Sequence, residues 1–171
     1  MYIINHHKQD AMKEIEIKSR IRIYDESELT PEDKKLIERA KEAALKSYTP
    51  YSRFQVGAAA CLSDGTVICG NNQENAAYPS GTCAERTTIF YANATYPEQA
   101  VATLAIAAYT NGHYLKAPIP PCGACRQVLL ETENRYNRNI RILLYGENGT
   151  YEVQTVKDLL PLQFVKETMD E

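Results

Sequence analysis

The sequence lacks three features that would each assign a protein to a broad class. No stretch reaches the roughly 18 consecutive apolar residues of a membrane-spanning helix, so we expect no membrane partner. The first residues contain neither a continuous apolar segment nor a small-residue cleavage site, so we expect no secretory signal and a cytoplasmic location. Basic residues are not in excess, with 19 Lys and Arg against 22 Asp and Glu. The net charge of −3 argues against a nucleic-acid partner.

The chain also lacks internal repeats, low-complexity segments and long linkers. Its 171 residues, 44% hydrophobic and 24% charged, have the composition of one soluble globular domain. We therefore predict a poorly ordered N-terminal lead-in over residues 1–12 and a single domain over residues 13–171.

The hydrophobic pattern predicts alternating strands and helices. Isoleucines alternate with charged residues over 13–24, which indicates a half-buried strand that extends a sheet edge or contacts a subunit. Further strands are predicted over 54–62, 66–71, 101–109, 140–145 and 151–154. Helices are predicted from Thr30 to before Pro50, over 83–94, over 122–135 and around 156–160. This order predicts the α/β class, a three-layer α/β/α sandwich with a central mixed sheet of about five strands plus an extra N-terminal strand.

Five cysteines in a chain without an export signal are more typical of thiols or metal ligands than of disulfides. Cys122 and Cys125 form a C-x-x-C at a predicted helix start, and Cys83 stands at another. A redox pair and a structural zinc site with a fourth protein ligand are both compatible with the C-x-x-C. Three converging thiolates would hold Zn²⁺ and leave one position for water, which is the catalytic pattern.

Glu85 follows Cys83 by two positions, and Ala84 lies between them. At a helix start this carboxylate is poorly aimed as a metal ligand, and it is better placed to accept a proton from water. A second interpretation is an acidic residue that stabilises the first helical turn.

Five motifs in order resemble the small homotetrameric zinc-dependent cytidine deaminases of pyrimidine salvage. They are Tyr51-Ser52-Arg53-Phe54-Gln55-Val56-Gly57-Ala58-Ala59, Asn72-Gln73-Glu74-Asn75-Ala76-Ala77-Tyr78-Pro79, Cys83-Ala84-Glu85-Arg86-Thr87, Pro121-Cys122-Gly123-Ala124-Cys125-Arg126-Gln127-Val128, and Leu159-Leu160-Pro161 with Phe164. The resemblance runs from about residue 30 to 165. Leu162 departs from it, because the family commonly has glycine there.

The resemblance implies a role for each matching residue. It implies one Zn²⁺ per chain on Cys83, Cys122 and Cys125, with Glu85 as the catalytic proton carrier. It also implies substrate contacts, with Asn72 and Glu74 at the ribose, Ala84 at the base edge, and Phe54, Tyr78 and Phe164 around the pyrimidine, the last two reaching a neighbouring subunit. Arg86 and Arg126 would balance the charge of the thiolates.

The implied activity is hydrolytic deamination of free cytidine and deoxycytidine to uridine and deoxyuridine, with release of ammonia. The implied assembly is a homotetramer with shared active sites. Two alternatives are a deaminase of a related, antibiotic-type nucleoside and a deaminase of cytosine in polynucleotides. The latter usually carries His-x-Glu at the position of Cys83-Ala84-Glu85.

Overall fold

The structure, a computed structural model, describes residues 3–5 and 13–169. The predicted lead-in over 1–12 lies outside the described residues, apart from the short strand β1. The strands are β1 (Ile3–Asn5), β2 (Glu14–Glu16), β3 (Ile21–Tyr24), β4 (Gln55–Leu62), β5 (Val67–Asn71), β6 (Val101–Thr110), β7 (His113–Tyr114), β8 (Arg141–Leu144) and β9 (Thr150–Val153). The helices are α1 (Pro31–Ala44), α2 (Ala84–Thr95) and α3 (Gly123–Tyr136), with four short 3-10 turns named η1 (Glu26–Glu28), η2 (Tyr78–Ser80), η3 (Val156–Leu159) and η4 (Lys166–Met169).

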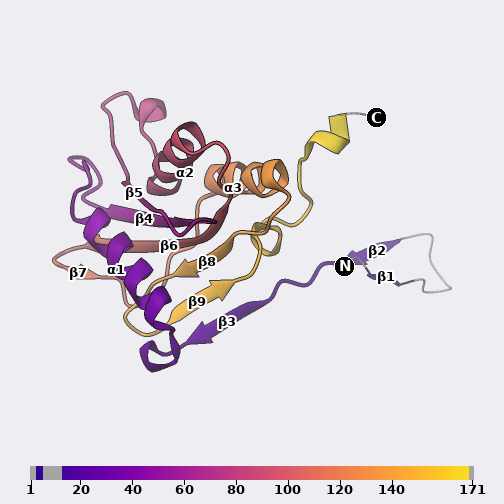
Figure 1. Cartoon of the computed structure of the whole chain (residues 1–171), viewed down its shortest axis with the longest axis horizontal. Helices are drawn as coiled ribbons and strands as arrows, with labels where there is room; N and C mark the ends of the chain where they lie inside the picture. The colour runs from indigo at the N-terminus through magenta and orange to yellow at the C-terminus, as the bar shows by residue number, and fades with distance from the viewer. Residues whose placement is uncertain (1–2, 6–12, 170–171) are drawn as a thin grey trace.

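A mixed sheet forms the centre of the molecule, in the order β3-β9-β8-β6-β4-β5, with β7 paired to β6. Only β6 and β8 are parallel. Helix α1 covers one face, and α2 and α3 lie together on the other (Figure 1). The three-layer sandwich predicted from the sequence is therefore confirmed. None of the described helices is long and apolar enough to cross a membrane.

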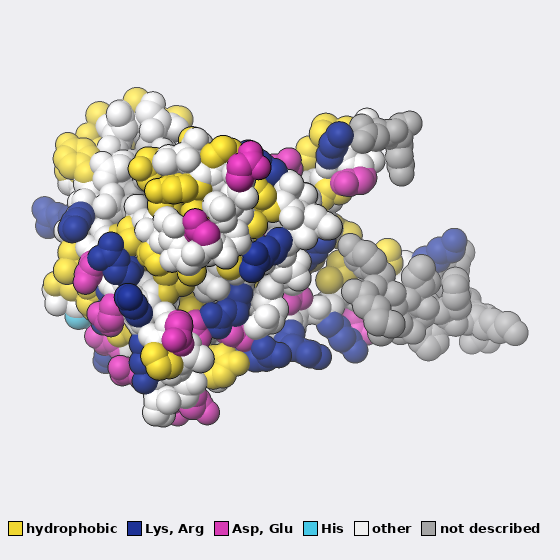
Figure 2. Space-filling view, in the orientation of Figure 1, with side chains coloured by type: hydrophobic (Ala, Val, Ile, Leu, Met, Phe, Trp, Pro, Cys, Tyr) yellow, Lys and Arg dark blue, Asp and Glu magenta, His cyan; other side chains and the backbone are white. Residues whose placement is uncertain are grey.

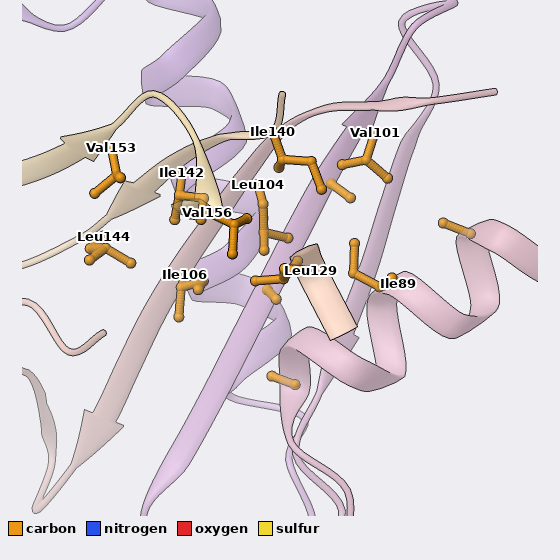
Figure 3. Packing of buried hydrophobic residues seen from close by; sticks show 14 of the residues in the cluster. Ile89, Val101, Leu104, Ile106, Leu129, Ile140, Ile142, Leu144, Val153 and Val156 are labelled. Carbon is orange, nitrogen blue, oxygen red and sulfur yellow. The ribbon is translucent and has the colours of Figure 1, made fainter. Parts of the chain in front are cut away.

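Strand β6 is buried on both faces, as its nearly continuous apolar sequence predicts. Leu104 and Ile106 point to the layer of α2 and α3, where they join Ile89, Leu129 and Val156 (Figure 3). The alternating residues Ala105 and Ala107 face α1. The small side chains on the α1 side let the helix lie close to the sheet.

Helix α1 approaches the sheet closely at Gly57 of β4. A methyl group added at Gly57 would overlap the backbone of α1 at Ala40 and Ala44. The helix presents Ala40, Ala43 and Ala44 there, all buried. Glycine is required at position 57 because any side chain would push α1 away.

The N-terminal segment differs from its prediction. Residues 13–24 do not form one half-buried strand: β2 pairs with β1 in a separate two-stranded sheet, and only β3 joins the central sheet, against β9. The four isoleucines are 36–63% exposed. Ile21 and Ile23 stand opposite Val153 and Tyr151 of β9, but the buried cluster ends at β9, so both lie uncovered.

An ion network around two buried carboxylates, Glu152 and Asp33, fastens β3 to the rest of the fold. Arg22 of β3 donates to Glu152 of β9 at 2.9 Å, and Arg141 of β8 donates to the other oxygen of Glu152 at 3.0 Å and to Asp33 at the start of α1. Burial acts to raise the pKa of Glu152, but the hydrogen bonds from Arg22, Arg141 and Gln154 outweigh burial, and the pKa is lowered. The network thus joins three strands and a helix.

We expect Gly57→Ala to lower the free energy of unfolding by about 3 kcal/mol, because α1 must move from β4. Gly123→Ala is the matched control, since an added methyl group at this helical position meets nothing within 4 Å. Urea denaturation of both variants measures the difference. Equal stability of the two variants would show that α1 does not depend on close packing at Gly57.

Candidate active site

Two helix N-termini on one face of the sheet carry the cysteines identified from the sequence. Cys83 is the N-cap of α2, Cys122 is the N-cap of α3, and Cys125 lies in the first turn of α3. Helix α2 is held against β5 at Gly70, where a methyl group would meet Thr88 at 2.5–3.2 Å. Both helices direct the positive ends of their dipoles to the cysteines, so negative charge on the cluster meets a favourable field.

The three sulfur atoms form a cluster able to hold a metal ion. Cys83 Sγ lies 3.8 Å from Cys122 Sγ, Cys122 Sγ lies 3.4 Å from Cys125 Sγ, and all three lie within 4.8 Å of one another. A tetrahedral zinc with Zn–S bonds of about 2.3 Å needs sulfur atoms about 3.8 Å apart. All five cysteines are free, so the cluster is not a disulfide. The donor set and spacing fit Zn²⁺.

The sulfur cluster already favours a thiolate at Cys83. A hydrogen bond from Cys125, together with the nearby Arg86, lowers the pKa of Cys83 to about 5, and the pKa of Cys125 is raised by the same hydrogen bond. Arg86 Nη2 lies 3.8 Å from Cys83 Sγ. Without a metal, Cys83 therefore favours the thiolate and Cys125 the thiol.

Glu85 lies in the first turn of α2 and is only 6% exposed. Burial raises the pKa of its carboxyl group, and a negative charge on Cys83 acts in the same direction. A raised pKa makes the carboxylate a stronger base than an exposed glutamate, which suits a group that takes up a proton and returns it. Ala84 is fully buried beside it.

A cavity of about 580 Å³ opens next to Cys83. Asn72 and Glu74 line it, as do Tyr78 and Arg86. One oxygen of Glu74 accepts hydrogen bonds from the backbone amides of Tyr51 and Ser52 at 2.9 and 3.2 Å. The hydrogen bond with the Ser52 side chain is the main cause that lowers the pKa of Glu74, so this carboxylate is charged at neutral pH.

Asn72 also has a local structural task. Its side chain accepts from the backbone of Val56 at 2.8 Å and donates to that of Phe54 at 2.9 Å. An amide can make further hydrogen bonds, so one donor and one acceptor site remain for a ligand. Phe54 is partly buried against the main core rather than in the lining of the cavity.

The two aromatic residues expected at a neighbouring subunit's site are exposed in this chain. Tyr78 is 75% exposed and stacks edge-on against Tyr51, with ring centroids 5.8 Å apart. Phe164 is 59% exposed and lies outside the cavity lining, on the C-terminal segment that extends from the body (Figure 1). A single chain thus does not bring Phe164 to the site.

The two arginines differ in their contacts. Arg86 lies against Cys83, as expected. Arg126 donates to the carbonyl oxygens of Pro121 at 2.8 Å and Leu159 at 2.7 Å, so its hydrogen bonds fasten the segment around η3 to the start of α3. Its role in balancing charge stays a prediction.

Leu162 keeps a backbone conformation that favours glycine. Its φ is 54°, and its side chain is 76% exposed. The resemblance gives glycine at this position, and the structure explains why: the chain turns through the left-handed region before Phe164. Leucine makes the same turn at a cost in backbone strain.

Tyr51 and Ser52 line the cavity, although no role was predicted for them. They face Glu74 because Arg53 adopts a φ of 56°, which turns the loop before β4. Nothing in the local sequence around Arg53 signals a left-handed arginine, and only Pro50, where the preceding helix was predicted to end, marked a break in the chain here.

A comparison with protein families identifies the family to which the chain belongs. Residues 30–138 match the model described as the cytidine and deoxycytidylate deaminase zinc-binding region. The chain belongs to this family. The matched residues include all three cysteines of the cluster and Glu85.

Individual members of the family are similar over most of their length. A cytidine deaminase of Halalkalibacterium halodurans is 43% identical over 136 residues, which are 80% of this chain and 96% of the relative. The crystal structure of a cytidine deaminase from Burkholderia pseudomallei is 42% identical, with a TM-score of 0.65, and covers 80% of this chain and all of its own. The crystal structure of the cytidine deaminase from Mycobacterium tuberculosis is 34% identical, with a TM-score of 0.61. The match covers 77% of this chain and 96% of the M. tuberculosis chain. About a fifth of this chain therefore has no counterpart in these relatives.

The cluster geometry predicts which cysteines control metal content. We expect Cys122→Ser to lower the zinc content well below one per chain, because it removes one of three convergent sulfurs. Cys61→Ser should keep the zinc, since Cys61 lies at the end of β4 against the α1 side of the sheet. Zinc measured per chain by atomic emission compares the two. Loss of zinc in both variants, or in neither, would contradict the assignment.

Proposed function

We propose that the protein is a zinc-dependent hydrolase that converts free cytidine and deoxycytidine to uridine and deoxyuridine, with release of ammonia, in pyrimidine salvage. The main support for this proposal is the arrangement of side chains at the site. Three convergent sulfurs lie next to a buried carboxyl group at a cavity lined by an amide and a carboxylate. The relatives named cytidine deaminase, at 42–43% identity, support the substrate class.

Cys83, Cys122 and Cys125 would hold the zinc ion. When bound there, zinc supplies a Lewis acid that lowers the pKa of water and so makes a nucleophile available near neutral pH. Three protein ligands leave a fourth position open, whereas a structural site would use four.

Glu85 is the proposed proton carrier. Its carboxylate accepts a proton from the attacking water, and the resulting acid donates that proton to the ring nitrogen next to carbon 4. With the water oxygen now bonded to carbon 4, Glu85 takes the remaining proton of that hydroxyl group and passes it to the amino group. The bond between carbon 4 and the amino nitrogen breaks, ammonia leaves, and carbon 4 becomes the carbonyl carbon of uridine. The raised pKa of Glu85 suits both directions of transfer, and its burial keeps bulk water from competing for the proton.

The cavity would orient the nucleoside. Glu74 has one oxygen left for ribose hydroxyls, and Asn72 retains one donor and one acceptor. The Ala84 backbone, at the start of α2, would read the edge of the base, with Phe54 packed behind it.

We further propose a cytoplasmic homotetramer in which neighbouring subunits complete each site. The outer face of α2 exposes Phe90 (52%) and Tyr91 (56%), and the exposed Tyr78 and Phe164 are aromatic residues without cover in one chain. Exposed aromatic residues are enriched at protein interfaces. The five free thiols suit a reducing compartment.

We expect Glu85→Gln to retain zinc and to lower turnover of cytidine by about 10³-fold or more, because proton transfer is lost. The matched control is Glu131→Gln, at an exposed position of α3. An ultraviolet assay with cytidine, deoxycytidine, adenosine and a cytosine-containing oligonucleotide measures turnover and substrate class. Near-native turnover by Glu85→Gln would remove this residue from the mechanism, and a preference for the oligonucleotide would overturn the proposed substrate.

Shared active sites predict complementation between two defective chains. Phe164→Ala should lower activity with zinc retained, since the base loses its stacking partner. When Phe164→Ala and Glu85→Gln chains are unfolded and refolded together, mixed sites regain both residues and activity should exceed the sum of the two homogeneous samples. Strictly additive activity would show that each chain uses its own Phe164.

A further inference from the structure

The N-terminal segment over residues 13–24 is an addition to the family domain. The family model begins at residue 30, and relatives match over 93–96% of their own length without about a fifth of this chain. The segment is anchored to the body by the pairing of β3 with β9 and by two side-chain hydrogen bonds. Ser19 donates to the backbone of Asp158 at 2.6 Å, and Arg22 donates to Glu152. All side chains from 13 to 23 are exposed.

Two features of the segment lack a packing or pairing partner in a single chain. It carries the isoleucine row Ile15, Ile17, Ile21 and Ile23, all uncovered. It also carries an isolated hairpin, since β1 and β2 pair only with each other in a two-stranded sheet that extends away from the body (Figure 1). Two-stranded hairpins are marginally stable alone. The free edge of β3 adds unpaired backbone groups at the end of the central sheet.

The charged residues of the segment are complementary to the same residues of a second copy of the chain. Over residues 14–20, the negative residues stand at the N-terminal end and the positive residues at the C-terminal end, and Figure 2 shows basic side chains gathered along β3. In an antiparallel pairing centred on Ile17, wherever two charged residues stand opposite each other, one is positive and the other is negative. It pairs Glu14 with Arg20, Glu16 with Lys18, Ile17 with Ile17, Ile15 with Ser19, and Lys13 with Ile21.

Neighbouring registers lose this match. Moving the centre by one residue places Lys18 opposite Lys18, or Glu16 opposite Glu16. A shift of pairing by one residue puts the central residues Ile15 and Ile17 opposite charged residues, whereas the register centred on Ile17 places an isoleucine opposite a charge only at its ends, where Ile21 meets Lys13. The register centred on Ile17 also leaves Arg22 free to keep its bond to Glu152.

We propose that residues 13–21 pair antiparallel with the same residues of a second copy of this chain, about a two-fold axis at Ile17. The partner's strand takes the place of β1 beside β2, because only three residue pairs hold β1 there. The contact joins two copies of the chain through the extension, and it does not depend on the proposed function of the sulfur cluster.

A charge exchange tests the pairing. The side chains of Glu14 and Arg20 make no hydrogen bond or ion pair with any other described residue. They stand six positions apart in an extended segment, about 20 Å, so they cannot pair within one chain. Glu14→Lys and Arg20→Glu should each weaken association through the extension about tenfold, since two contacts of the two-fold pair become repulsive. The double variant Glu14→Lys/Arg20→Glu should restore it.

The readout is a cross-link at the axis. In the full-length chain, Ile17→Cys places two thiols opposite each other and should give a disulfide-linked dimer on a non-reducing gel at low micromolar protein. The intensity of the dimer band should decrease when Glu14→Lys or Arg20→Glu is added to Ile17→Cys, and it should recover when both are added. Ile15→Cys, which faces Ser19 of the partner in this register, is the control for random collision, and the unaltered chain controls for the native cysteines.

Two results would overturn the proposal. One is an Ile17→Cys dimer no stronger than that of Ile15→Cys or the unaltered chain, which would mean that the charged edge keeps copies apart. The other is a dimer that responds to single charge variants but is not restored by the double variant, which would mean a different register. Because neither variant touches the sulfur cluster, deaminase activity is an independent measurement.

Discussion

Three sulfur atoms within 4.8 Å of one another can carry negative charge together only if positive charge lies among or around them. The rest of the site follows from this constraint. Two helices must direct their N-termini to the same point, and Arg86 must lie against Cys83. Glu85, buried in the same turn, feels both the low dielectric of its surroundings and the nearby thiolate, so its pKa is raised. One electrostatic requirement thus links the metal cluster to the proton carrier.

The fold meets this requirement through close packing rather than through bulky side chains. Alanines and glycines let the helices lie directly on the sheet, with Gly57 under α1 and Gly70 under α2. A displacement of α2 by the size of one methyl group would move Cys83 relative to Cys122, which comes from a different helix. The precision of the site therefore depends on residues that never contact a ligand.

The parts of the structure governed by local rules could be predicted from the sequence. Thr30-Pro31 set the start of α1, and the apolar run of β6 identified a strand buried on both faces. The three cysteines and Glu85 could be grouped because their chemistry limits what they can do together. Isoleucine alternation in the N-terminal segment led to a wrong prediction of a half-buried strand, since alternation shows that one face is apolar and not that another part of the chain covers it. The left-handed backbone conformation of Arg53 and the hydrogen bonds from Arg126 to carbonyl oxygens depend on tertiary packing. No sequence pattern therefore predicted them.

The central claim is that three cysteine sulfurs, and only three protein ligands, hold the zinc. Zinc X-ray absorption on the purified protein without substrate tests it most directly. The account predicts three sulfur atoms at about 2.3 Å and one oxygen atom at about 2.0 Å from the metal. A coordination shell of four sulfurs, or of three sulfurs and an imidazole nitrogen, would identify a closed structural site and contradict the account.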